Sequence, residues 1–312
     1  MKRKVFDAEF IRKYGILMVL VIMWVIMLAV SPTFRTVSNA VNILRQVAVN
    51  GILAIGMTFV IMTGGIDLTV GSLVAVAGVI SGSILVVHPE QVILAVLAGI
   101  VVCGLFGAMN GFFVAYMEVP AFVATLAGMT IARGFAYIYS DGKPYTLNSP
   151  KFRIIGQGMA PIIIFLAILL ICHIVLSKMK FGRYIYATGG NIKAAEASGV
   201  NTKKILMKVY ILAGTLSGIA GIVLASRTNS GQPAVGTGFE TDAIAAAVIG
   251  GTSMTGGIGT IPGTLVGILI IGTLNNSLNL LNVSSYYQQI IKGIIILGAV
   301  CSDIVSKKIQ NK

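Results

Sequence analysis

Ionisable and amide side chains inside long apolar runs are the residues of this chain that could carry chemistry. Asp67 lies in GGIDLTVGS, and Arg133 lies in TLAGMTIARGFAYIY. If such runs cross a membrane, a charge at the bilayer centre costs about 2.5–3.5 kcal/mol on insertion scales and needs a partner or a wet cavity. Uncharged hydrogen-bonding groups accompany these two residues in or beside other apolar runs: Asn110, Thr125, Asn275, Asn276, Asn279 and Gln288.

These side chains suit the passage of a neutral, hydroxyl-rich solute, because sugar hydroxyls exchange hydrogen bonds with amides without burying an ion. We therefore take six of them as candidates for a translocation pathway: Asp67, Asn110, Thr125, Arg133, Asn275 and Gln288. Hydrogen bonding between helices is the alternative role, and it accounts for at least half of the amides and hydroxyls. We expect Asp67 to cap the helix that begins near Thr69, which leaves a pathway role open. Arg133 could contact the solute, pair with Asp67 or extend to the membrane surface, and no pattern selects among these roles.

Catalytic and metal-binding patterns are missing from the sequence. His88 and His173 are solitary, and the three cysteines lie far apart, at 103, 172 and 301. There is no phosphate-binding Gly-x-x-x-x-Gly-Lys-Ser/Thr motif and no nucleophile paired with a base. We therefore expect no enzyme activity, no metal site and no cofactor in this chain.

The composition is that of an all-α, polytopic helical membrane protein. Of 312 residues, 56% are hydrophobic and 11% are charged, whereas soluble domains carry roughly 25% charged residues. The net charge of +13 does not indicate nucleic-acid binding, because the basic residues gather near both ends and in one central segment and form no patch interleaved with aromatic side chains.

About ten apolar runs approach the ~20 residues that a spanning helix needs. They are residues 14–30, 47–63, 70–87, 92–117, 120–139, 161–177, 209–226, 241–255, 261–281 and 287–305. We expect one membrane domain, residues 1–312, with a cytoplasmic tail at 1–13. The run 241–255 is short and ends in polar residues, so a re-entrant or broken helix is open there. The first run is long for a signal peptide, and we expect it to stay attached as a span.

The segment 178–208 is polar and strongly basic between two apolar runs. It contains Lys178, Lys180, Arg183, Lys193, Lys203, Lys204 and Lys208. Lys and Arg mark cytoplasmic loops, and alternating ten spans from a cytoplasmic N-terminus puts this segment and the C-terminus inside. Lys143, Lys151 and Arg153 lie outside on this alternation, against that rule. A short helical pattern over 191–200, between glycines, offers a surface that a cytoplasmic motor protein could bind.

Glycines recur inside the apolar runs at spacings that let helices approach closely in lipid, as at Gly107 and Gly111 or Gly214 and Gly218. A faint internal repeat relates residues 64–71, GGIDLTVG, to residues 250–257, GGTSMTGG. Paired glycine-interrupted segments point to the transport path in many transporter folds, although a match this short and glycine-rich also arises by chance.

Several of these motifs together resemble the permease subunits of bacterial ATP-binding-cassette importers for ribose, xylose, arabinose and galactosides. The resemblance covers about residues 32–303, and its carriers are GGIDLTVGS, VPAFVATLAGM, ARGFAY, GGNIKAAEASGVNTKKI and GGIGTIPGTLVGILIIGTLNNSLNLLNVSSYYQQIIKG. It implies a type II importer permease fold with about ten transmembrane helices in the bacterial inner membrane.

The resemblance also implies partners: cytoplasmic ATPase subunits, an extracytoplasmic solute-binding protein and a second permease subunit, identical or related. The segment that would couple to the ATPase then consists of Gly190, Asn191, Ala194, Ala195, Glu196, Ser198 and Gly199. A stand-alone secondary transporter or channel is the alternative. Such carriers place titratable groups near the midplane, and only Asp67 and Arg133 qualify here.

Overall fold

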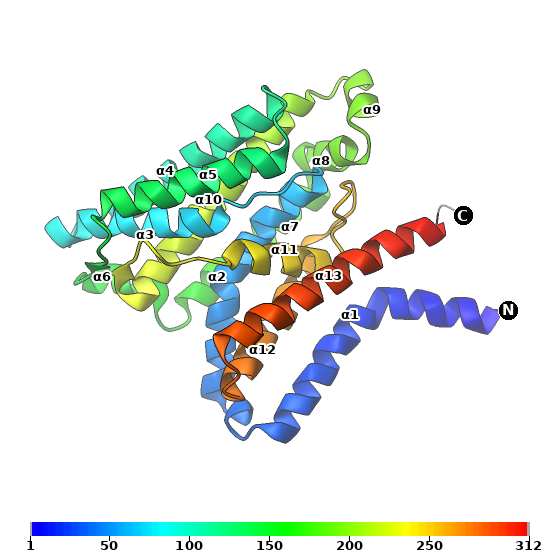
Figure 1. The fold of residues 1–312 in the computed structure, drawn as a ribbon, viewed down its shortest axis with the longest axis horizontal. Coiled ribbons are helices and arrows are strands. Elements are labelled where there is room, and N and C mark those ends of the chain that lie inside the picture. The colour runs from blue at the N-terminus through cyan, green and yellow to red at the C-terminus, as the bar shows by residue number, and fades with distance from the viewer. Residues whose placement is uncertain (1, 311–312) are drawn as a thin grey trace.

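The computed structural model describes residues 2–310 and is almost entirely helical across them (Figure 1). Its elements in chain order are α1 Lys2–Val30, η1 Thr33–Arg35, α2 Val37–Met62, α3 Val70–Val87, α4 Val92–Ala115, α5 Ala121–Tyr139, β1 Tyr145–Thr146, α6 Pro150–Gly156, α7 Ala160–Lys178, α8 Lys180–Gly190, α9 Ile192–Ala197, α10 Thr202–Thr228, β2 Ser230–Gly231, α11 Phe239–Ile249, α12 Ile261–Leu280 and α13 Ser285–Gln310. The two short strands pair antiparallel.

Seven helices of the described residues are long and apolar enough to cross a membrane, namely α2, α3, α4, α5, α7, α10 and α12. With α1, α13 and the short α11, they match the ten expected runs in order. The 11 residues of α11 rise about 16 Å at 1.5 Å per residue, which is about half of a hydrocarbon core. The run 241–255 is therefore a broken helix, and no continuous span forms there.

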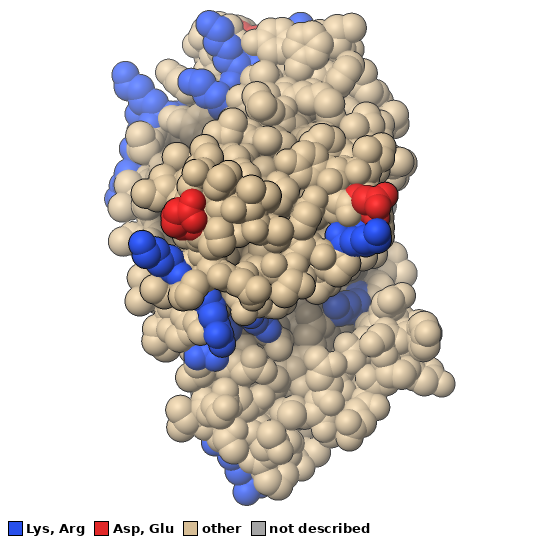
Figure 2. Space-filling model, turned by 90° about the vertical axis from the view of Figure 1, so that its left-hand side faces the viewer, with Lys and Arg blue, Asp and Glu red and all other residues tan. Residues whose placement is uncertain are grey.

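The ends of the bundle separate into two groups. α6 and the β1–β2 pair lie at one end, whereas α8, α9, the first turns of α1 and the last turns of α13 lie toward the other (Figure 1). Charges are sparse at the end with α6, and Lys and Arg outnumber Asp and Glu there (Figure 2). The placement of α8, α9, the start of α1 and the end of α13 toward one end of the bundle agrees with the expected alternation of spans.

The centre of the bundle is formed by α2, α3 and α10, whose apolar side chains are mostly buried. α4 lies along α10 through the expected glycine faces. A Cβ at Gly107 would overlap the Tyr210 carbonyl oxygen, and one at Gly214 would overlap the Cys103 carbonyl oxygen. Small residues at these positions therefore allow the two backbones to touch.

Several helices extend beyond the apolar runs that predict them. α2 starts at Val37 because the Thr36 side chain accepts a hydrogen bond from the Asn39 amide. α10 starts at Thr202 because Asn201 accepts one from the Lys204 amide. Polar first turns are thus helical once they are capped. The segment 178–208 is mostly helix as well, and the expected tail at 1–13 continues the first helix from Lys2.

Candidate functional site

The short helix α9 is built by the residues that the sequence singles out. Asn191 Oδ1 accepts a hydrogen bond from the Ala194 amide at 3.0 Å, and the Ser198 amide returns to the Ala194 carbonyl oxygen at 3.0 Å. Gly199 follows with φ +82°, a conformation that favours glycine. Gly199 thus follows the end of α9 at Ala197, and the helix is shorter than the pattern over 191–200.

One face of α9 packs onto its own chain and the other is open. Ala195 is only 4% exposed, whereas Ile192, Lys193, Ala194 and Ser198 are exposed. The Thr202 hydroxyl donates to Glu196 Oε1, which ties α9 to the start of α10. Ala194 is therefore accessible to a partner protein, whereas the buried Ala195 packs α9 against the rest of its own chain.

Helix α8 packs against the membrane bundle at a junction formed by Met62, Gly189 and Gly257. The Gly257 amide donates to the Met62 carbonyl oxygen at 2.9 Å, and a Cβ at Gly189 would overlap that same oxygen. The Tyr186 hydroxyl donates to the Gly259 carbonyl oxygen at 2.7 Å, and burial raises the pKa of Tyr186, so the donor stays protonated. The two glycine-rich segments of the faint repeat thus meet here, against the end of α8.

A cleft of about 450 Å³ separates α9 from the ends of α2, α4 and α10. Lys203 forms an ion pair with Glu118 across its rim at 3.0 Å. Lys193, Glu196 and Tyr210 also line it. Ile192 and Lys193 of α9 line the cleft as well, so the cleft and the open face of α9 are both available to a protein that binds at this end of the bundle.

Three pathway candidates form a closed cluster in the bundle. The Asp67 carboxylate accepts a hydrogen bond from the Thr69 amide at 2.9 Å. Asn110 donates to the Thr69 hydroxyl at 3.2 Å, and Thr125 donates to the Ile66 carbonyl oxygen at 3.2 Å. Since Asp67, Asn110 and Thr125 are fully buried, they hold the turn before α3 in place. Thr69 itself is the N-cap, so Asp67 closes the preceding turn and does not cap the first helical turn as expected.

Arg133 holds the turns that precede α11, residues 233–238. Its guanidinium donates to the carbonyl oxygens of Pro233 and Val235 at 2.6 and 2.7 Å. Of the three roles left open, pairing with Asp67 is excluded in this conformation, because Asp67 is held by Thr69. Arg133 satisfies backbone oxygens that the broken helix leaves exposed.

Asn275 and Gln288 line a polar cavity of about 280 Å³ between α2, α11, α12 and α13. At its centre Asp242 accepts hydrogen bonds from Asn275 at 3.2 Å and from Lys292, whose ammonium lies 3.0 Å from Oδ1. Sequence reasoning missed Asp242 and Lys292. The signal was present, because Lys292 is the only basic residue in the last apolar run and Asp242 lies at the start of the shortest one.

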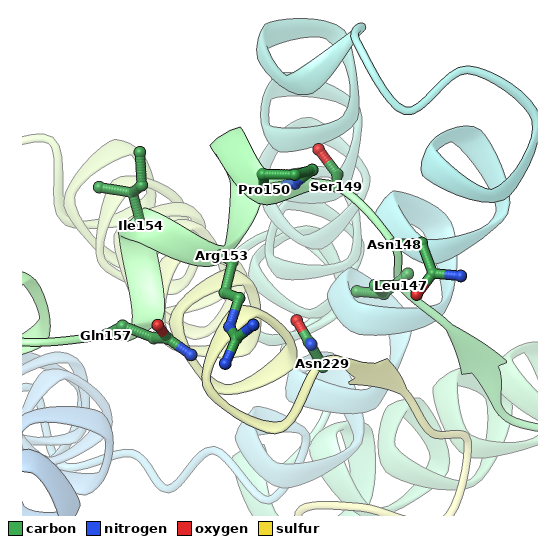
Figure 3. Close-up of a pocket in the computed structure, with 8 residues that line it drawn as sticks. All are labelled: Leu147, Asn148, Ser149, Pro150, Arg153, Ile154, Gln157 and Asn229. Carbon is green, nitrogen blue, oxygen red and sulfur yellow. The ribbon is translucent and has the colours of Figure 1, made fainter.

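A cavity of about 500 Å³ lies at the opposite end from α9. Arg153 of α6 and Gln157, which follows the helix, point toward Asn229, and Asn148 lies on the far wall (Figure 3). Arg153 is exposed, so the cavity offers a cation and several amides to a partner on this side. Among the described residues no cluster of His, Cys, Asp and Glu could hold a metal ion.

A family model described as the permease component of the branched-chain amino acid transport system matches residues 39–300. The chain is 44% identical to the ribose import permease protein RbsC of Escherichia coli strain K12, over 96% of both chains. It is 45% identical to RbsC of Bacillus subtilis strain 168, over 97% of this chain and 95% of the relative.

The L-arabinose transport system permease protein AraH of Escherichia coli strain K12 is 38% identical over 95% of this chain and 92% of its own. No solved structure matches the chain significantly.

Proposed function

Because the chain belongs to this family of importer permease components, and is thus a multi-pass membrane permease and not an enzyme, we propose that its cargo is a pentose of the ribose type. The observation that carries this proposal is the identity of 44–46% to ribose import permeases over at least nine-tenths of the chain, against 37–38% for the arabinose and allose relatives. The scarcity of charge in the spans supports a neutral solute.

Transport is driven from the side of α9. We propose that the open face formed by Ile192, Lys193, Ala194 and Ser198 enters a groove of an ATPase subunit. The Met62–Gly189–Gly257 junction would then carry any displacement of α8 into α2 and the 250–260 segment. Coupling requires that the ATPase bind two arrangements of this junction with different affinity.

The opposite face receives the solute. The cavity beside α6, with Arg153 exposed in it, supports docking of a solute-binding protein through acidic side chains. A second copy of the permease would complete the pathway, and the proposal includes a dimer of this chain.

Reconstituted uptake tests the assignment. The chain is co-expressed with its ATPase and binding protein, inserted into proteoliposomes and supplied with labelled ribose, arabinose and allose. We expect uptake that needs ATP inside and binding protein outside, with ribose preferred. Uptake driven by a proton gradient without ATP would instead establish the secondary transporter, and equal uptake of all three sugars would contradict the cargo.

A further inference from the structure

The Asp242–Lys292 ion pair forms the common wall of two cavities in the half of the bundle nearer to α6. The cavity toward α2 and α12 measures about 280 Å³, and the cavity between α11 and α13 measures about 480 Å³. Asp242, Gln288 and Lys292 line both. A solute that passes from one to the other must meet this pair.

The side chains around the pair are arranged as hydrogen-bond partners for hydroxyl groups. Asp242 Oδ2 accepts from Asn50 at 3.5 Å, from Asn275 at 3.2 Å and from Lys292 at 3.2 Å. A carboxylate has two oxygens that can accept from two neighbouring hydroxyls, and each amide offers both a donor and an acceptor. Asn275 Oδ1 is buried without a hydrogen-bond partner among the described residues, so one acceptor of a residue that lines the cavity is unsatisfied.

Charge and shape favour a small neutral molecule over an ion. Arg227 and Lys292 line the two cavities together with Glu240 and Asp242, so the formal charges balance. Phe239 forms part of the wall of both cavities and is half-buried, which gives an apolar surface for the C–H face of a sugar ring. A cavity of this size is at the small end of ligand sites, roughly 300–1,000 Å³.

We propose that the cavity around Asp242, Asn275 and Lys292 binds the monosaccharide during translocation, with Asn275 hydrogen-bonding one of its hydroxyls. This inference rests on the proposed sugar transport. If the cavity binds the sugar, Asn275 helps to determine which sugar the permease accepts. This selection adds to the one made by the binding protein.

Cysteine protection tests the site in the complete complex. Cys103, Cys172 and Cys301 are replaced by Ser or Ala, and Asn275→Cys is introduced and treated from outside with an impermeant thiol reagent during turnover. We expect labelling that slows about tenfold at sugar concentrations near ten times the apparent Kd, because about nine-tenths of the sites are then occupied. The matched control is Asn276→Cys, because Asn276 is 4% exposed and bonded to Asn39 at 2.9 Å; it should stay unlabelled.

A second measurement separates sugar contact from a structural role. Asn275→Ala should change the uptake ratio of ribose to a deoxyribose about tenfold with the same binding protein, because one hydroxyl contact is worth about 1.4 kcal/mol. ATPase stimulation by the binding protein should be retained.

The inference would be overturned if Asn275→Cys is not labelled, or if sugar does not change its labelling rate. An unchanged uptake ratio of ribose to deoxyribose in Asn275→Ala would overturn it as well. If the parent complex transports sugar with ATP while these results are negative, the proposed function stands and only the site fails. If the parent complex moves no sugar with ATP, the proposed function itself fails.

Discussion

Arg133 illustrates how a charge inside a span is compensated in this protein. Its guanidinium donates to two carbonyl oxygens of the turns before α11, a segment that lies outside any helix. A cation inside a membrane span therefore replaces the bonds that a continuous helix would make.

Arg133→Met should destabilise the protein by roughly 3 kcal/mol, because hydrogen bonds to a charged group are worth about 1.5–3 kcal/mol each and the gains overlap. The readout is the thermal midpoint of the detergent-solubilised protein. Arg153→Met, at an exposed position, is the control and should leave the midpoint unchanged. A midpoint in Arg133→Met equal to that of the parent would show that the two contacts carry little energy.

Gly189 and Gly190 form a natural matched pair. A Cβ at Gly189 would overlap the Met62 carbonyl oxygen, whereas one at Gly190 meets nothing within 4 Å. Gly189→Ala should therefore abolish ATP-driven uptake or assembly, and Gly190→Ala should leave both near the parent level. Uptake and the yield of assembled complex are measured side by side. Equal behaviour of the two variants would contradict the tight junction.

At the scale of elements, α9 and α11 are the two short helices on which transport is expected to depend. α9 is six residues long and has one buried side chain, Ala195, so its position depends on the Glu196–Thr202 bond and on Gly199. α11 depends on Arg133 and on close contact with α12, where a Cβ at Gly267 would overlap the Ala246 carbonyl oxygen.

Ala194→Trp should uncouple transport and leave the permease folded, because Ala194 is exposed on α9 and the ATPase would have to accommodate the larger side chain. Ala195→Trp should instead unseat α9, since Ala195 is buried. ATPase stimulation, uptake and protease sensitivity of the 178–208 segment distinguish the two. Normal uptake and stimulation in Ala194→Trp would remove this face from the docking surface.

Gly199→Val should also uncouple transport. Its φ of +82° is costly for a β-branched residue, so the turn from α9 to α10 would shift. Gly190→Ala serves again as the control, because Gly190 has no positive φ and a Cβ added there would meet no atom within 4 Å. Full ATPase stimulation in Gly199→Val would show that the turn is not needed for coupling.

At the scale of the molecule, the two ends of the bundle must face different compartments. Lys193 lies on α9 and Lys151 lies on α6, and these helices occupy opposite ends (Figure 1). In intact cells an impermeant reagent should label Lys151→Cys and spare Lys193→Cys until the membrane is opened. The reverse pattern would invert the orientation. Lys307, whose side chain lies outside the described residues, should behave like Lys193 because α13 ends at the same side.

Composition and motif spacing alone determined the class of protein. With 11% charged residues the chain cannot build a soluble surface, so membrane helices, their approximate number and the basic inner segment follow from local composition. The short helix α9 was also predictable, because capping by Asn191 and the positive φ at Gly199 depend on neighbouring residues.

Contacts between residues far apart in the sequence could only be decided by the tertiary structure. Asp67, Asn110 and Thr125 carry the same polar groups as a solute pathway, yet each hydrogen-bonds the 66–69 turn. Asp242 and Lys292 lie 50 positions apart, and nothing local to either residue reveals that they share a cavity with Asn275. A polar side chain in a span either stabilises the bundle or contacts the solute. Its sequence neighbours do not distinguish these roles, because the distinction depends on which helix packs against it.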